Sequence, residues 1–191
     1  MQLILASSSP YRRALLARLG LAFDCVAPEI DESRREGETP QQLVLRLSLE
    51  KAGAVARHHP EALVIGSDQV ACLDGEVLGK PGDEATAIRQ LQQQSGRTVQ
   101  FLTGVCLFDG TDNSHDTQLE TVTVQFRDLS DTEIQRYLQQ EQPWDCAGSF
   151  KSEARGVGLV QAIRCTDSTA LMGLPLIRTA AMLRAKNYNI P

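Results

Sequence analysis

Short apolar runs alternate with helix-like repeats through the first part of the chain. Leu3 to Ala6 is a short apolar run that is typical of a buried strand, and Phe23 to Ala27 and Leu63 to Gly66 have the same character. Between these runs the pattern predicts a helix from Pro10 to Leu19 and a longer helix from Thr39-Pro40 to Arg57. Strands that alternate with helices in this way indicate an α/β fold.

The later part of the chain adds antiparallel hairpins to this pattern. Asp74-Gly75 is a tight-turn signal between two short apolar runs, and Thr98 to Phe108 with Gln118 to Phe126 predicts a long hairpin. The remaining predicted elements are a helix from Asp83-Glu84 to Gln94, a helix from Ser130 to Gln140, a strand from Gly156 to Cys165 and a helix from Pro175 to Lys186. We therefore expect an α/β fold with a mixed, mostly central sheet flanked by helices. It would form one domain over residues 1–191, and this domain could consist of two lobes around a central cleft.

Composition and charge exclude several classes of protein. Hydrophobic residues make up 42% of the chain and charged residues 23%, which is ordinary for a globular domain. The net charge of -5 argues against a nucleic-acid partner, which needs a basic face. No apolar run approaches the roughly 20 residues that span a bilayer. The cysteines number five, with no C-x-x-C spacing, which disfavours disulfides and zinc. We expect a cytoplasmic protein with no membrane partner.

The loop from Ser7 to Arg13 is the first candidate site. The N-terminus of a helix presents unpaired N–H groups and the positive end of the helix dipole, so it attracts anions. The hydroxyls of Ser7 and Ser9 add donors, and Arg12 and Arg13 add planar guanidinium groups that suit phosphate. The alternative is a serine-capped surface helix with two solvated arginines.

Asp68 is the second candidate. In Gly66-Ser67-Asp68-Gln69 it directly follows a buried apolar run, so we expect it where that strand leaves the sheet. Ligands of open α/β sheets collect at the carboxyl ends of strands, where a carboxylate can hold Mg²⁺ or accept a proton from water. The alternative is an Asx-turn that ends the strand.

Two lysines and one acidic segment offer weaker signals. Lys51 lies four residues after Leu47, on the apolar side of its helix, where it either extends to solvent or points into a phosphate site. Lys80 lies in the turn Gly79-Lys80-Pro81, where a lysine is usually solvated. The segment Pro28 to Glu32 is typical of a solvated face, but Glu32 would help to hold a metal if the segment returned to the site.

The loop from Cys146 to Glu153 consists mostly of small and polar residues. Such a loop suits recognition of a base edge, and it is equally typical of an ordinary surface loop. Cys146 has no histidine near it in the sequence to activate it, so catalysis by a Cys/His pair is disfavoured.

The motifs taken together resemble one family. They are Leu5-Ala6-Ser7-Ser8-Ser9-Pro10-Tyr11-Arg12-Arg13, Asp31-Glu32, Glu50-Lys51-Ala52, Gly66-Ser67-Asp68-Gln69-Val70, Gly79-Lys80-Pro81, Thr103-Gly104 and Gly173-Leu174-Pro175. In this order they resemble the Maf family of nucleotide pyrophosphatases across essentially the whole chain, which implies a Maf/ITPase-like fold. Ser67-Asp68-Gln69 and Gly148 to Glu153 are most similar to the type that acts on 7-methyl-GTP, the YceF type.

The resemblance implies roles for particular residues. It implies Asp68 as the proton acceptor, and Tyr11, Gln69 and Glu153 as the positions that set base preference; the YceF type usually has tryptophan where this chain has Tyr11. The substrate would be a nucleoside triphosphate. Its charge would be neutralised by a divalent metal cation (Mg, Mn or Co) at Glu32 and Asp68, and by a phosphate-binding set of Ser7, Ser9, Arg12, Arg13, Lys51 and Lys80.

Alternatives to 7-methyl-GTP hydrolysis stay open at this point. The same reaction on dTTP, UTP or another modified nucleotide is one of them. Another is a nucleotide-binding regulator of septum formation, which the full charged set around Asp68 disfavours. A homodimer is an expectation that rests on the family resemblance alone.

Overall fold

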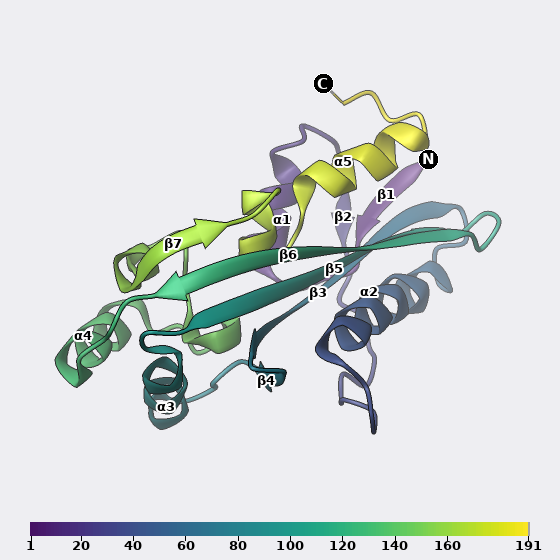
Figure 1. The fold of residues 1–191 in the computed structure, drawn as a ribbon. Helices are drawn as coiled ribbons and strands as arrows, with labels where there is room; N and C mark the ends of the chain where they lie inside the picture. The colour runs from purple at the N-terminus through teal and green to yellow at the C-terminus, as the bar shows by residue number, and fades with distance from the viewer. Residues whose placement is uncertain (191) are drawn as a thin grey trace. The chain divides into compact units, whose positions relative to one another are not determined.

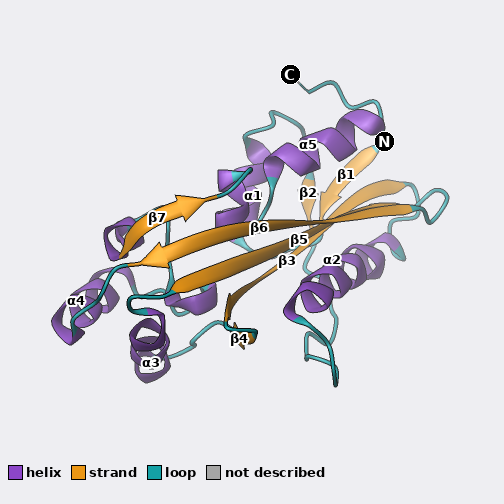
Figure 2. Cartoon of the chain, viewed as in Figure 1, coloured by secondary structure: helices purple, strands orange, loops and turns teal. Residues whose placement is uncertain are grey.

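The computed structural model describes residues 1–190; Pro191, the last residue of the predicted domain, lies outside the described residues. Within them a mixed seven-stranded sheet has the order β2-β1-β3-β5-β6-β7, and β4 pairs with β3 (Figures 1 and 2). The strands are β1 (Gln2–Leu5), β2 (Asp24–Cys25), β3 (Ala62–Leu73), β4 (Glu76–Leu78), β5 (Thr98–Asp109), β6 (His115–Phe126) and β7 (Val160–Arg164). β1 runs parallel to β2 and β3, whereas β7 runs antiparallel to β6. The predicted mixed α/β class is confirmed.

The helices begin where their capping residues predict. They are α1 (Pro10–Ala17), α2 (Pro40–Ala56), α3 (Glu84–Gln94), α4 (Asp131–Glu141) and α5 (Leu176–Ala185), with short 3-10 segments at η1 (Ala147–Ser149), η2 (Arg155–Leu159) and η3 (Ser168–Met172). Thr39 and Gln42 form a capping box at α2, and Ser130 and Glu133 form another at α4. Each box satisfies backbone N–H groups that would otherwise lack partners.

The structure corrects the prediction for the middle of β3. A strand from Leu63 to Gly66 was predicted to end before Asp68, but β3 is continuous from Ala62 to Leu73, so Asp68 lies within a strand and not at its exit. The Oγ of Ser67 lies 2.7 Å from the carbonyl oxygen of Gly104 and 2.9 Å from that of Gly173. Because such buried partners satisfy polar side chains, the chain has no need to leave the sheet here.

Two other predicted strands are shorter in the structure. The strand predicted from Phe23 to Ala27 reduces to the two residues of β2, and the one predicted from Gly156 to Cys165 reduces to β7 with η2 before it. Glycines at 156 and 158 add no side chain to a sheet face, which favours the tighter 3-10 turn.

The chain forms two compact units. The first contains residues 1–68, 103–120 and the segment from Asp167; the second contains residues 69–102 and 121–166. In the first unit, Leu3 and Leu5 of β1 pack with side chains of α1 and α5, and the intervening Ile4 packs with side chains of α2. This alternation places helices on both faces of the sheet (Figure 1). In the second unit the ring of Phe150 lies 5.6 Å from that of Phe101 and 5.2 Å from that of Phe126.

Two glycines let α2 lie directly against the sheet. A Cβ at Gly66 of β3 would overlap the carbonyl oxygen of Ser48 and come within 2.8 Å of the backbone nitrogen of Ala52. A Cβ at Gly104 of β5 would lie 2.5 Å from the carbonyl oxygen of Val44. Side chains two residues apart share one face of a strand, so Asp68 faces the same helix as Gly66.

We expect the Gly66→Ala variant to be destabilised by about 2–3 kcal/mol, because the added methyl group must push the backbone of α2 away from that of β3. Chemical denaturation measures this change in unfolding free energy. The matched control is Gly158→Ala, where an added Cβ meets nothing within 4 Å; its stability should change by less than about 0.5 kcal/mol. Equal stability of the two variants would contradict the close contact.

Candidate functional site

The loop after β1 begins the site. Ala6 makes the last hydrogen bond to β3, from its N–H to the carbonyl oxygen of Ile65 at 2.8 Å, and Ser7 follows as a buried residue. The Oγ of Ser7 accepts a hydrogen bond from the N–H of Ser9 at 3.1 Å. Ser9 is the N-cap of α1, and Pro10 occupies the first turn. The loop therefore places the N-terminus of α1 directly beyond the carboxyl end of β1.

A lysine and two carboxylates form the centre of the site. The Nζ of Lys51 lies 2.7 Å from Oδ1 of Asp68 and 3.1 Å from Oε2 of Glu32. Lys51 is 5% exposed and Asp68 is 7% exposed, so the interpretation that Lys51 extends to solvent is wrong. Glu32 is more than half exposed, and its acidic segment does return to Lys51. The close approach of α2 to β3 at Gly66 brings this pair together.

Arg12 adds a second cation. Its Nε donates a hydrogen bond of 2.8 Å to the carbonyl oxygen of Gly173, which orients the guanidinium group. Desolvation lowers the pKa of Arg12, and the negative charges of Asp68 and Glu32 oppose that shift. The carboxylates thus offset part of the repulsion between the Arg12 cation and the positive end of the α1 dipole. Arg13, the next residue, is exposed.

The oxygen donors of this centre fit a divalent metal ion. Glu32 and Asp68 offer carboxylates within hydrogen-bond distance of the same ammonium group, so both point to one place. Residues 1–190 contain no cluster of three or more histidine, cysteine or acidic side chains with the geometry of a metal site. Mg²⁺ is commonly held by one or two carboxylates and completed by substrate phosphates, so two protein ligands are compatible with it.

The other predicted contacts are distributed between the units. Tyr11, in the first turn of α1, is partly exposed and belongs to the first unit. Gln69, Lys80 and Glu153 belong to the second, where Gln69 is partly buried and the other two are exposed. The N–H of Gly148 donates to the carbonyl oxygen of Gly79 at 3.2 Å. The loops that carry Lys80 and Glu153 are therefore tied to each other within the second unit.

The loop of Cys146 to Glu153 is partly structural. Ser149 is buried and its Oγ donates to Oε1 of Gln90 at 2.6 Å, while Phe150 packs in the core of the second unit. Burial and the neighbouring carboxylate of Asp145 raise the pKa of the Cys146 thiol to about 12. The thiol is therefore protonated at neutral pH, which argues against a role as a nucleophile.

No structural role was predicted for Ser67, Gly173 or the residues that hold the segment after Glu32. Ser67 and Arg12 both meet the carbonyl oxygen of Gly173, so this glycine links β3 to α1. The available signal was Gly173-Leu174-Pro175, because a glycine before such a pair often marks a special backbone conformation. Gly173 does adopt a φ of 105°.

Comparison with known proteins identifies the relatives of the chain. The 7-methyl-GTP pyrophosphatase of Albidiferax ferrireducens is 52% identical over 99% of this chain and 95% of its own length. Proteins of the same name from Ralstonia nicotianae and Pseudomonas aeruginosa are 53% and 51% identical, over 97% and 99% of this chain and 96% and 98% of their own lengths.

The Ham1 protein of Staphylococcus aureus shares the fold, with a TM-score of 0.58 over 97% of this chain and all of that one. It is only 15% identical, so the likeness concerns the fold alone. No helix in residues 1–190 is long and apolar enough to cross a membrane. The model of the family described as Maf-like protein matches residues 2–186. This chain belongs to that family, as its motifs indicated.

Proposed function

We propose that this protein hydrolyses 7-methyl-GTP to 7-methyl-GMP and pyrophosphate. The names of relatives that are 51–53% identical over nearly the whole chain support this substrate. The observation that carries the reaction type is the charged centre of Lys51, Asp68 and Glu32 beside the N-terminus of α1. This centre combines cations, which would bind phosphate, with carboxylates, which would hold a metal ion or act on water.

In the proposed complex, several groups neutralise the triphosphate. The hydroxyls of Ser7 and Ser9 and the N-terminus of α1 would donate hydrogen bonds to phosphate oxygens. The cations would be Arg12, Arg13, Lys51 and Lys80. Charge that develops on the leaving pyrophosphate is stabilised most when such donors are already oriented, as Arg12 is by Gly173.

Asp68 would act on the attacking water. Its carboxylate would orient or deprotonate a water molecule, whose oxygen forms a bond to the α-phosphorus while the bond to the bridging oxygen of pyrophosphate breaks. The hydrogen bond from Lys51 holds the Asp68 carboxylate in one orientation. Glu32 and Asp68 would hold a divalent cation (Mg, Mn or Co), which would supply further charge neutralisation at the phosphates.

Three residues would set the base preference. The ring of Tyr11 would stack on the cationic 7-methylated purine. The carboxylate of Glu153 would accept N–H donors from the Watson–Crick edge of guanine, which thymine and uracil cannot match. Gln69 follows Asp68 in β3 and would offer a neutral donor or acceptor to the base.

We expect Glu153→Gln to reduce the preference for 7-methyl-GTP over dTTP and UTP by about tenfold, because the amide loses the charge and one acceptor. The ratio of kcat/KM values for these nucleotides measures the preference. Glu84→Gln, an exposed residue of α3, is the matched control and should leave the ratio unchanged. An equal loss on all three nucleotides would show that Glu153 does not recognise the base.

A nucleotide panel with product identification tests the proposal. Purified protein with Mg²⁺, Mn²⁺ or Co²⁺ is incubated with 7-methyl-GTP, GTP, dTTP and UTP, and the products are separated by anion-exchange chromatography. The proposal requires the highest kcat/KM on 7-methyl-GTP. Preference for dTTP or UTP would overturn the substrate, and nucleotides that all survive would overturn the reaction in favour of a binding role.

A further inference from the structure

The segment between Asp31 and Glu38 belongs to a long connection without helix or strand, which joins β2 to α2. Long irregular loops in compact domains are usually functional or mobile, because ordering each residue costs about 1–2 kcal/mol. Glu32 lies in this segment, and its side chain is 56% exposed, so packing does little to hold it. Its contact with Lys51 therefore depends on what holds the backbone around it.

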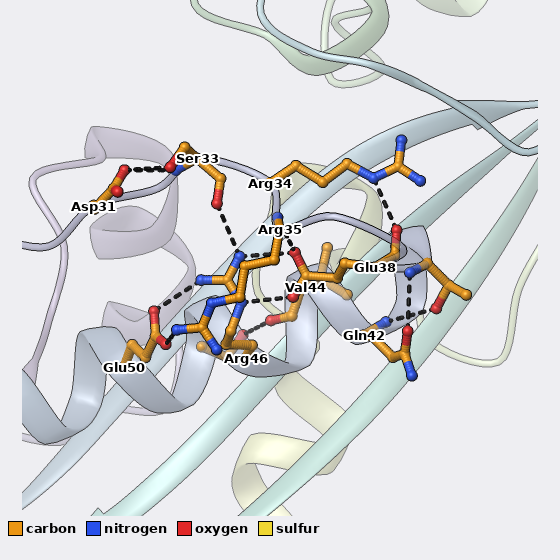
Figure 3. A network of polar contacts seen from close by, with 11 residues as sticks. Asp31, Ser33, Arg34, Arg35, Glu38, Gln42, Val44, Arg46 and Glu50 are labelled. Atoms are coloured by element: carbon orange, nitrogen blue, oxygen red, sulfur yellow. Dashed lines mark hydrogen bonds and ion pairs between the residues drawn. The ribbon is translucent and has the colours of Figure 1, made fainter.

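Arg46 of α2 holds that backbone (Figure 3). Its Nη2 donates to the carbonyl oxygen of Ser33, the residue after Glu32, at 3.0 Å. The same guanidinium group binds both carboxylate oxygens of Glu38, from Nε at 2.6 Å and from Nη2 at 2.8 Å. Its Nη1 donates to Glu50 at 2.9 Å. The Arg46 side chain is only 13% exposed, so these contacts are shielded from solvent.

Glu38 folds the segment back on itself. Its Oε2 accepts a hydrogen bond from the N–H of Arg35 at 3.1 Å, and its carbonyl oxygen accepts one from Nε of Arg34 at 2.8 Å. The hydrogen bond from Arg46 lowers the pKa of Glu38 to about 2, so the carboxylate is charged throughout the neutral range. Bidentate arginine–carboxylate pairs combine strength with a defined geometry.

On the other side of Glu32, the carboxylate of Asp31 accepts hydrogen bonds from the N–H and Oγ of Ser33, at 2.9 and 2.7 Å. The contacts between Asp31 and Ser33 form a local turn across Glu32, and Arg46 ties the residue after Glu32 to α2. We propose that Arg46 is a positioning residue that keeps Glu32 at the Lys51–Asp68 centre by binding Ser33 and Glu38. This role rests on the function proposed above for Glu32.

Arg46→Met tests the role, because it keeps an unbranched apolar side chain and removes every donor. We expect kcat on 7-methyl-GTP to fall by on the order of 10- to 100-fold, as for other residues that orient the groups of a site without contacting the substrate. The decisive arm is a double-variant cycle with Glu32→Gln. If Arg46 acts through Glu32, Arg46→Met should add less than about twofold to the loss in the Glu32→Gln protein.

Two further variants distinguish a loss of Glu32 positioning from a general loss of structure. Glu38→Gln, which keeps Arg46 but weakens the bidentate pair, should lower kcat in the same direction and by less. Arg35→Met is the matched control, since its guanidinium group is exposed and forms an ion pair with Glu50; its kcat should stay within about twofold of the wild-type value. Multiplicative losses in the double-variant cycle, or an unchanged kcat in Arg46→Met, would overturn the proposal.

Hydrogen exchange provides a readout that does not depend on activity. In Arg46→Met the amides of residues 32–38 should exchange at least tenfold faster, while those of β1 and α5 keep their protection. If the wild-type protein hydrolyses no nucleotide, the proposed function fails, and exchange alone decides the role of Arg46 in holding the segment. Unchanged exchange of residues 32–38 would overturn that role even if the protein is an active pyrophosphatase.

Discussion

Asp68→Asn should lower kcat on 7-methyl-GTP by at least about 1,000-fold while leaving the fold intact. The amide has the shape of the carboxylate and still accepts a hydrogen bond from Lys51, but it cannot take a proton from water and is a poor ligand for a divalent cation. Removing a general base alone costs about 100- to 10,000-fold. Single-turnover kinetics measure the loss in the chemical step.

The control for this variant is Asp116→Asn, an exposed aspartate of β6 whose carboxylate accepts a hydrogen bond from Gln118 at 2.8 Å. It should retain wild-type kcat. The unfolding free energy of Asp68→Asn should change by no more than about 1–2 kcal/mol, because Lys51 keeps a hydrogen bond to the amide oxygen and its ion pair with Glu32. A fully active Asp68→Asn protein would contradict the proposed mechanism.

Lys51→Met should be the most destabilising substitution in the charged centre, at about 3 kcal/mol. It leaves the Asp68 carboxylate, which is 7% exposed, beside Glu32 without the ammonium group that both contact. Breaking a buried ion pair by removing one partner typically costs about 3–5 kcal/mol, and the charge of Arg12 offsets part of this cost. Urea denaturation measures the change, and kcat should fall as well because the proposed contact of Lys51 with phosphate is lost.

The double variant Lys51→Met/Asp68→Asn separates this charge effect from lost packing. Removing the isolated carboxylate should restore at least half of the lost stability, since the buried charge is then absent. Arg35→Met removes a cation whose Nη2 lies 2.8 Å from Oε1 of Glu50, but the two side chains are 66% and 31% exposed. Its stability should change by about 1 kcal/mol or less. If the double variant is no more stable than Lys51→Met, burial of charge does not explain the loss.

Helices and their ends were the features that the sequence predicted best. Thr39, Asp83 and Ser130 all cap helices in the structure as their positions indicated. Capping depends on residues close in sequence, so a single sequence contains the necessary information. The turn at Asp74-Gly75 was also predicted, and both residues adopt positive φ values, of 50° and 88°.

The centre of β3 could not be predicted in this way. Gly66-Ser67-Asp68-Gln69 has the composition of a loop, and it remains in the sheet because Lys51, Gly104 and Gly173 supply partners from distant parts of the chain. The same long-range contacts determine where the Lys51 side chain points. Its position on the helix was compatible either with extension to solvent or with a phosphate site. Tertiary partners override local preference at such positions.

The segment after Glu32 was missed for a related reason. Its charged residues are typical of a solvated surface, whereas the contacts of Arg46 with Ser33 and Glu38 show that the segment is held against α2. The family motifs drew attention to Asp31-Glu32 but gave no role to Arg46. Residues that orient the groups of a site without contacting the substrate have no local sequence pattern that marks this role.

In the proposed reaction, water attacks the α-phosphorus of 7-methyl-GTP at the Asp68 centre. The most direct test is hydrolysis of 7-methyl-GTP in water labelled with heavy oxygen, with both products analysed by mass spectrometry. Attack at the α-phosphorus should place one labelled oxygen in 7-methyl-GMP and none in pyrophosphate. Label in pyrophosphate, or formation of 7-methyl-GDP and inorganic phosphate, would contradict it.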